Sequence, residues 1–318
     1  MKYRTLGKSK IKVSEIGLGG LFLGSKGREN GIRIVRRALE LGINYFDTAP
    51  SYQIGDGTPY SQEVLGEALD GVRESHFVST KIGPSPLFPS AKYDYDSIMK
   101  QIDHNLKQLR RDKIDIVFIH DPDRYGDPIN PGNYHPVFGR GMALESLHKL
   151  KEEKIINAVG IASLWLDYQA YCVERGVLDV ILTFNRYGLI WRDAQFQLFP
   201  FCRKHEVGIV QGTPFHQGIF TCPHHEWKDD PPEWMNHVEH DRYQKLLLIQ
   251  ENSGICFPEL ALRFLLTKIE IGSIIQGATS VKELEENVAC SDLGPLPPDI
   301  SEEIESIGIM HEDPRRLK

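Results

Sequence analysis

Four side chains in this chain of 318 residues could transfer a proton together: Asp47, Tyr52, Lys81 and His120. A phenol works as a proton donor or acceptor near neutral pH only if a nearby cation and some desolvation bring its pKa down. Lys81 could be that cation, with Asp47 holding it charged and His120 orienting a substrate oxygen. Read singly, each residue also fits an ordinary role, such as a buried ion pair or a core histidine.

Three apolar segments must position these four residues, because each has the composition of a buried strand and ends at one of them. They are Tyr45–Asp47, with Tyr52 just beyond it, then Phe77–Lys81 and Ile114–His120. In a parallel barrel all strands end on the same face. The sequence therefore predicts that the four side chains converge at one mouth.

The rest of the chain predicts the same architecture. About eight strand and helix alternations, each unit roughly 30 residues long, indicate an α/β fold of the (β/α)8 TIM-barrel type. We expect a single domain over residues 1–318, an N-terminal β-hairpin returning at Ile11–Val13, and long loops at the C-terminal face. No Gly-x-Gly-x-x-Gly follows the first predicted barrel strand, Glu15–Gly20, which disfavours a Rossmann domain. A polar insertion from His216 to about His240 precedes a helix expected over Tyr243–Gln250.

The four residues, in this order and spacing, together with the opening Met1–Gly7, resemble the aldo-keto reductases over nearly the whole chain. The resemblance implies an enzyme that moves a hydride between a nicotinamide cofactor and a carbon bearing an oxygen. It also implies the roles: Tyr52 transfers the proton, Lys81 tunes its pKa, Asp47 holds Lys81, and His120 orients the substrate oxygen. The cofactor is implied because no side chain could carry the hydride.

The segment from Gln276 to Asn287 resembles the part of these enzymes that binds adenosine. Glu283 stands where members that prefer NADPH place an Arg. A carboxylate repels a 2′-phosphate but can accept a hydrogen bond from a ribose 2′-hydroxyl, so NAD is preferred and NADP is possible. Lys282 argues against this preference, and Glu283 could instead be only a solvated helix residue. The candidate cofactor-binding residues are Gly20, Asp47, Ser163, Asn185, Thr213, Phe215, Gly218, Gly277, Ala278, Thr279, Glu283, Glu286 and Asn287.

Some positions depart from the family pattern at the nicotinamide end. The Ser-Asn pair that holds the amide is Ala162–Ser163 here, and the following Gln is Phe184 with Asn185 beside it. The Tyr that commonly stacks on the ring falls at Gly212. These changes leave the amide contacts open.

Other runs resemble one branch of the family, which oxidises aldoses at C1 and contains L-galactose and L-fucose (D-threo-aldose) dehydrogenases. They are His120–Arg124, Arg186–Tyr187 with Leu189, and Thr213–Phe215 with Gly218. The branch includes pyridoxal dehydrogenases, so the substrate stays open between an aldose and pyridoxal. Reduction of aldehydes or ketones with NADPH is a further alternative.

Two other functional classes match parts of this sequence. Potassium-channel β subunits of this family bind nicotinamide cofactor mainly to sense or regulate, but the complete set of four residues argues against that role. A Schiff-base aldolase would need Lys81 with a depressed pKa, whereas Asp47 should hold it charged.

Composition limits the partners and the compartment. A net charge of −7 and a pI near 6.0 offer no basic surface for nucleic acid or an anionic membrane. The sequence shows no long apolar run and no signal peptide, so we expect a cytoplasmic monomer or small homo-oligomer that acts on a small molecule.

The cysteines and histidines do not predict a metal site. The five cysteines are scattered, which argues against a disulfide framework or structural zinc. The insertion carries several histidines and Cys222, but none of the spacings matches a metal motif, and a solvated loop is favoured.

Overall fold

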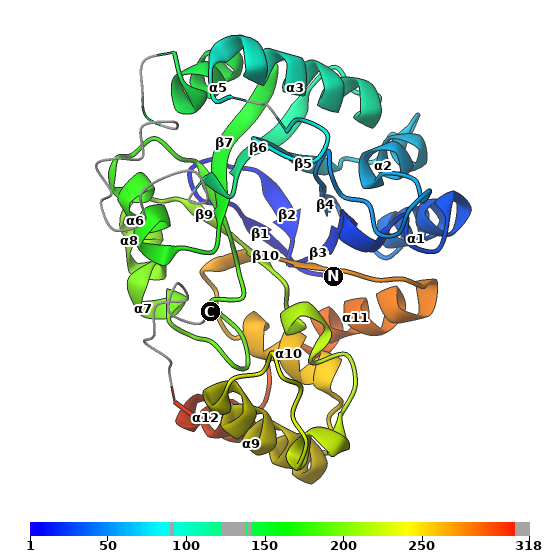
Figure 1. Cartoon of the computed structure of the whole chain (residues 1–318), viewed down its shortest axis with the longest axis vertical. Coiled ribbons are helices and arrows are strands. Elements are labelled where there is room, and N and C mark those ends of the chain that lie inside the picture. The colour runs from blue at the N-terminus through cyan, green and yellow to red at the C-terminus, as the bar shows by residue number, and fades with distance from the viewer. Residues whose placement is uncertain (90–91, 123–137, 139–140, 309–318) are drawn as a thin grey trace.

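A computed structural model describes residues 1–89, 92–122, 138 and 141–308 of the chain. Within these ranges, eight parallel strands close into a barrel in the order β10-β3-β4-β5-β6-β7-β8-β9 (Figure 1). The predicted (β/α)8 barrel is therefore confirmed. The barrel strands are β3 (Ile16–Gly19), β4 (Tyr45–Asp47), β5 (Phe77–Ile82), β6 (Ile114–His120), β7 (Ile156–Ser163), β8 (Val180–Phe184), β9 (Gly208–Gly212) and β10 (Ile271–Gln276).

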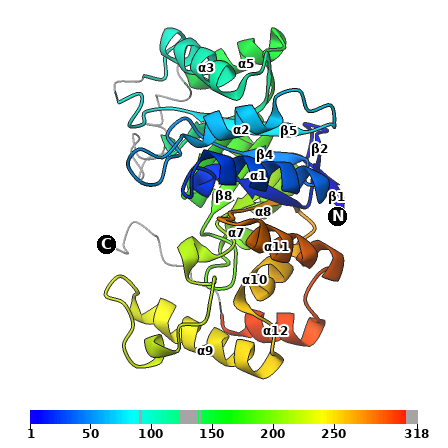
Figure 2. The same cartoon turned by 90° about the vertical axis from the view of Figure 1, so that its right-hand side faces the viewer.

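Most of the helices surround the barrel, and their apolar faces pack on the outer side of the strands. Figure 2, turned by 90°, shows α9 and α12 side by side at the end of the molecule farthest from α3 and α5. The helices are α1 (Arg28–Glu40), α2 (Ser61–Leu69), α3 (Tyr95–Leu109), α5 (Ala143–Glu152), α6 (Leu166–Glu174), α7 (Ala194–Gln197), α8 (Phe199–Lys204), α9 (His237–Ser253), α10 (Phe257–Leu266), α11 (Val281–Leu293) and α12 (Pro298–Ser306). None of the helices in the described ranges is both long enough and apolar enough to span a lipid bilayer.

Helix α9 begins at His237, earlier than the predicted start at Tyr243. The Asn236 side chain accepts hydrogen bonds from the amides of Val238 and Glu239, each at 3.0 Å, and Glu239 reaches back to the amide of Asn236 at 3.3 Å. This capping box satisfies amides that would otherwise lack a partner in the first turn. It lets a polar, histidine-rich stretch start a helix before the apolar pattern begins.

The predicted N-terminal hairpin is confirmed as the antiparallel pair β1 (Tyr3–Thr5) and β2 (Lys12–Ser14). Its apolar side chains Leu6, Ile11 and Val13 join the cluster that fills the inside of the barrel. That interior is tightly packed: a Cβ placed on Gly160 of β7 would lie 2.5 Å from the ring of Phe118 on β6. The hairpin therefore plugs the base of the barrel, and a ligand must approach from the carboxyl ends of the strands.

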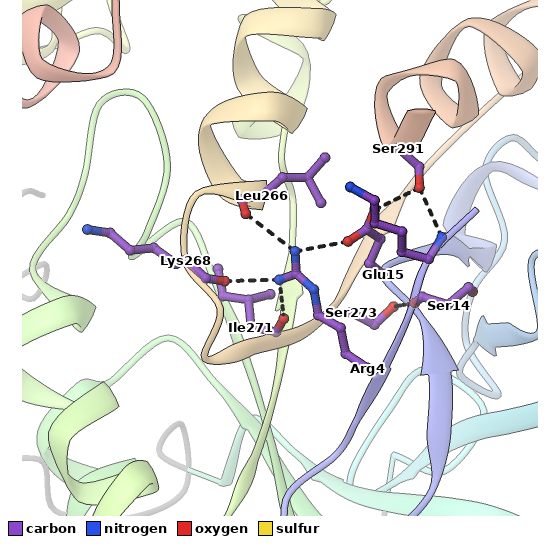
Figure 3. A network of polar contacts seen from close by, with 9 residues as sticks. Arg4, Ser14, Glu15, Leu266, Lys268, Ile271, Ser273 and Ser291 are labelled. Carbon is purple, nitrogen blue, oxygen red and sulfur yellow. Dashed lines mark hydrogen bonds and ion pairs between the residues drawn. The ribbon is translucent and has the colours of Figure 1, made fainter. Parts of the chain in front are cut away.

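Arg4 fastens the hairpin to the last strand of the barrel and the helices that flank it (Figure 3). Its guanidinium pairs with Glu15 at 2.9 Å, and the other oxygen of Glu15 accepts a hydrogen bond from Ser291 of α11 at 2.7 Å. The same guanidinium donates to three backbone carbonyls between α10 and β10, those of Leu266, Lys268 and Ile271. One arginine thus links the first and last elements of the barrel.

Candidate active site

The four proton-transfer candidates lie at the ends of three adjacent strands. Asp47 ends β4, Lys81 is the penultimate residue of β5, and His120 ends β6. In the parallel register Asp47 lies opposite Ser79 of β5, and Lys81 lies opposite Phe118 of β6. The turn after β4 then carries Tyr52 back over the barrel mouth.

Lys81 stands at the centre of the group. Its ammonium donates to Asp47 Oδ2 at 2.7 Å and to the carbonyl of Thr48 at 2.9 Å. The same Nζ lies 4.6 Å from the centre of the Tyr52 ring. The Tyr52 and His120 rings meet edge to face, with centres 6.3 Å apart. The structure therefore brings together the four side chains that the sequence predicted to converge.

The electrostatics of this group keep the lysine charged. Burial alone would lower the pKa of Lys81, but the attraction of Asp47 and Tyr52 outweighs it and the net pKa is raised. A charged ammonium is a poor nucleophile, so this geometry argues against a Schiff-base role for Lys81.

The pKa of Tyr52 differs from the prediction. Burial raises it, Lys81 lowers it, and the Asp47 charge raises it again, so the net direction is upward rather than downward. The prediction counted the cation but not the desolvation of the ring or the carboxylate behind the lysine. In this structure Tyr52 is held as a neutral phenol, which can donate a proton.

Two functional neighbours were missed in the sequence. The Ser79 hydroxyl donates to Asp47 Oδ1 at 2.7 Å, and the Tyr45 hydroxyl donates to Ser79 Oγ at 2.9 Å. Both residues are buried inside the barrel. Side chains two residues apart along a strand point to the same face, so the spacing of Ser79 and Lys81 could have identified Ser79.

Among the candidate cofactor residues, Asn185 and Thr213 meet across the ends of β8 and β9. The backbone amide of Asn185 donates a hydrogen bond to Thr213 Oγ1 at 2.9 Å. Both residues, and His216 and Gln217 after them, have positive φ angles between 47° and 57°. Such backbone strain in non-glycine residues gathers at functional sites. Asn185, Thr213 and His216 line a small hollow with Tyr187 and Trp191. The candidates Phe215 and Gly218 lie in the same segment of chain after β9.

The second set of candidate cofactor residues surrounds the start of α11. The Glu283 carboxylate accepts hydrogen bonds from the Thr279 amide at 2.8 Å and hydroxyl at 3.0 Å. It therefore also holds its own loop, a role that the sequence did not predict. Asn287 donates to Gln276 Oε1 at 2.8 Å, while Glu286 is exposed and faces Lys282 at 3.7 Å.

The remaining candidates lie where the backbone itself is close-packed or buried. A Cβ on Gly20 would lie 2.3 Å from Ser61 Oγ, and one on Gly277 would lie 3.0 Å from the Phe22 ring. Ala278 is buried, and Ser163 is buried with its hydroxyl accepting from the Trp165 amide at 3.0 Å.

Polar atoms at the strand ends fit the needs of a nicotinamide dinucleotide. Within the described ranges, Asn185 Oδ1 and Gln276 Nε2 are buried and lack a hydrogen-bond partner, as does Gln211 Oε1. Buried polar atoms are normally paired, so unsatisfied ones mark a place for a ligand's polar groups. One donor and two acceptors suit an amide and hydroxyl-rich ligand, so the residues present fit this cofactor.

A larger open hollow lies elsewhere, lined by Arg36, Glu40, Asp70 and Glu74 between α1 and the loop before β5. This loop enters a strand, so the hollow lies on the amino-terminal face, opposite the face where barrel enzymes carry their chemistry. Size alone therefore does not identify the site. In the part of the chain that the structure describes, His, Cys, Asp and Glu side chains form no group of three or more that could hold a metal ion.

Asp123 and Arg124, which contributed to the resemblance to the aldose-oxidising branch, lie outside the described residues.

Comparisons with known proteins match this geometry. The sequence profile described as "Aldo/keto reductase family" matches residues 15–309. L-galactose dehydrogenase of Arabidopsis thaliana is 30% identical over 301 residues, which cover 91% of this chain and 88% of the relative. D-threo-aldose 1-dehydrogenase of a Pseudomonas species is 25% identical, with 87% and 89% covered. The holo form of an aldo-keto reductase from Bacillus halodurans superposes with a TM-score of 0.79 at 26% identity, with 98% and 99% covered.

Proposed function

Because this chain belongs to the aldo/keto reductase family, as its motifs predicted, we propose that it oxidises an aldose at C1 to the lactone with NAD. Enzymes of this family are oxidoreductases that use nicotinamide cofactors, NAD or NADP. The observation that carries the oxidoreductase part of the proposal is the placement of Lys81 between Asp47 and the ring of Tyr52, with His120 beside it. We further propose that residues 1–318 form one domain, since the hairpin and the barrel share a core.

In this proposal the chain's own residues handle the proton. The substrate hydroxyl at C1 lies against Tyr52 and His120, and ionised Tyr52 or His120 takes its proton as the carbonyl forms. Lys81 lowers the cost of a negative charge on Tyr52, and Asp47 keeps Lys81 charged and in place. A nicotinamide cofactor, when bound, supplies the acceptor for the hydride.

The residues proposed to hold the cofactor are those at the ends of β7 to β10. Asn185, next to the Phe184 that replaces the family's Gln, offers a buried carbonyl oxygen for an amide, and Gln276 offers an amide nitrogen. Gly277, Ala278 and Thr279 lead to Glu283, whose carboxylate disfavours a 2′-phosphate and supports the preference for NAD. Lys282 is exposed beside it and faces Glu286, so its charge is partly offset.

Support for an aldose substrate comes from the relatives, whose names describe dehydrogenases of L-galactose and of D-threo-aldoses. The same four proton-transfer residues would serve pyridoxal oxidation or aldehyde reduction equally well. Substrate choice must therefore be measured.

The test is a set of initial rates at alkaline pH with NAD or NADP, a panel of aldoses and pyridoxal, followed by the absorbance of the reduced cofactor. We expect NAD-linked oxidation of a sugar. Activity with pyridoxal alone, or only with NADPH and simple aldehydes in the opposite direction, would overturn the aldose assignment.

Tyr52→Phe tests the site itself. It removes the hydroxyl that exchanges the proton, so turnover should be abolished while NAD binding, measured by calorimetry, persists. Tyr3→Phe is the matched control, because this phenol on the far side of the barrel only donates to the Gly42 carbonyl. Loss of NAD binding in Tyr52→Phe would show that the site is misplaced.

A further inference from the structure

The insertion between β9 and α9 contains a cysteine, a histidine and a glutamate in a relay outside the active site. Cys222 Sγ lies 3.5 Å from His224 Nε2, and His224 Nδ1 lies 3.3 Å from Glu226 Oε1. Cys222 is exposed. We propose that Cys222 is a nucleophilic thiol that exchanges with small disulfides, with His224 as its proton acceptor and Glu226 as the group that orients the imidazole.

His224 is held in place through both its ring and its backbone. Its ring stacks on the Trp227 indole with centres 3.7 Å apart and planes 10° apart. Its backbone amide donates to the hydroxyl of Tyr243, a buried residue of α9, at 2.7 Å. Trp227 is itself fixed, because its carbonyl lies 2.7 Å from His240 Nε2 and its ring packs on Tyr243 and Trp234. An oriented base next to a thiol is the arrangement that activates cysteine nucleophiles.

The local charges support the relay. A hydrogen bond from its own backbone amide and the neighbouring His224 hold the pKa of the Glu226 carboxyl below its usual value, so Glu226 is an anion at neutral pH. The nearby side chains of His225 and Lys228 instead face Glu251, at 3.4 Å and 3.0 Å. Glu226 is therefore directed to His224.

This setting separates Cys222 from the other cysteines. Burial raises the pKa of the thiols of Cys172, Cys202 and Cys290, which makes them inert. Cys256 is exposed as well and stands at the N-cap of α10. Of the five cysteines in the sequence, Cys222 and Cys256 are exposed and three are buried, so Cys256 serves as the internal reference for the reactivity of Cys222.

The proposed exchange needs no oxidant or reductant other than the small disulfide. When His224 Nδ1–H donates to Glu226, the lone pair of Nε2 faces the thiol and accepts its proton. The Cys222 thiolate then attacks one sulfur of the small disulfide, a new S–S bond forms and the old one breaks. The departing thiolate takes the proton from the imidazolium, which restores neutral His224.

The test uses the full chain and oxidised glutathione, a tripeptide disulfide, with peptide mapping by mass spectrometry to give a rate for each cysteine. At pH 7 we expect Cys222 to form the mixed disulfide about tenfold faster than Cys256. His224→Gln should slow Cys222 about tenfold at pH 7 but leave it almost unchanged at pH 10, where an ordinary thiol with a pKa of about 8.5 is ionised without help. Glu226→Gln should give a smaller loss.

His225→Gln is the matched control, since it removes the neighbouring exposed imidazole and should leave the rate at Cys222 unchanged. Equal rates for Cys222 and Cys256 would overturn the proposal. So would a His224→Gln protein slowed equally at both pH values, because that pattern reflects altered packing around Trp227 rather than a lost proton acceptor.

Discussion

Lys81 and Asp47 form a 2.7 Å ion pair that is almost sealed from solvent, with 2% and 3% of their side chains exposed. Burying such a pair costs desolvation free energy that the attraction between the charges barely offsets. Removing one partner is far worse, because it strands the other charge in the interior. The pair is therefore expected to matter for both folding and chemistry.

Asp47→Asn should lower the free energy of unfolding by about 3–5 kcal/mol, because Lys81 loses the carboxylate that compensates its buried charge. Urea denaturation measures this change. The double variant Asp47→Asn with Lys81→Met removes both charges and should recover much of the loss. A single variant as stable as the parent would contradict the buried-pair account.

The raised pKa of Tyr52 gives a direction to the pH profile. In the proposed mechanism oxidation uses the ionised phenol, so its kcat/KM should keep increasing with pH and not level off below about pH 10, the usual phenol pKa. Reduction uses the neutral phenol, so its rate should stay flat through neutral pH and fall only at higher pH.

Lys81→Met is the informative comparison for this profile, since Lys81 is the largest influence that lowers the pKa of Tyr52. Loss of Lys81 should shift both the rise of the oxidation rate and the fall of the reduction rate to still higher pH. An oxidation rate that peaks near neutral pH would mean that another group exchanges the proton.

Ser79→Ala tests the neighbour of Asp47 that the sequence reading missed. The hydroxyl donates to a carboxylate, so its removal should cost about 1.5–3 kcal/mol of stability. We also expect kcat to fall about tenfold, which corresponds to about 1.4 kcal/mol of barrier, with little change in the KM for NAD. Ser273→Ala is the matched control: it loses a buried hydrogen bond whose acceptor is the Ser14 carbonyl and not Asp47. If both variants lose kcat equally, the loss in Ser79→Ala reflects lower stability and not the lost contact with Asp47.

Glu283→Gln tests the preference for NAD. Glutamine keeps an acceptor for the Thr279 amide but removes the charge, so the Kd for NADP should tighten about fivefold relative to that for NAD. Fluorescence titration measures both constants without turnover. Glu285→Gln, which breaks only a surface pair with Arg37, should leave the ratio unchanged. If the ratio also stays constant in Glu283→Gln, then Glu283 serves only its loop.

Arg4→Met tests the link between the hairpin and the end of the barrel. Glu15, only 3% exposed, would lose its cation and three carbonyls would lose a donor, so stability should fall by about 3 kcal/mol. Arg37→Met removes an arginine that is 38% exposed and should change stability very little. Thermal unfolding of the two variants, measured side by side, tests both expected changes in stability.

The fold and the convergence of the four candidate side chains on one face could be predicted because both follow from local patterns. Apolar runs ending at Asp47, Lys81 and His120 identify strands, and a parallel barrel then places their ends on one face. Neither step requires the position of a distant side chain.

What escaped prediction depends on contacts that the sequence does not reveal. The pKa of Tyr52 depends on how deeply its ring is buried, and a strand pattern does not give burial at a loop residue. Cys222, His224 and Glu226 lie where an irregular loop enters a short 3-10 helix, His225–Lys228, and their spacing in the sequence does not reveal which way the side chains point. The early start of α9 depends on the capping contacts of Asn236, which a search for apolar periodicity overlooks.

The closure of the barrel has a consequence for how the protein is made. Strand β3 pairs with β10, so that Ile16 lies opposite Ile274 and Leu18 opposite Gln276. A ribosome adding about 5–20 residues per second delivers β10 roughly ten to fifty seconds after β3. Throughout that interval the nascent sheet has an open edge of unpaired amides and carbonyls, which invites pairing with another chain. Translation speed and chaperone access during this interval should therefore govern the yield of folded protein.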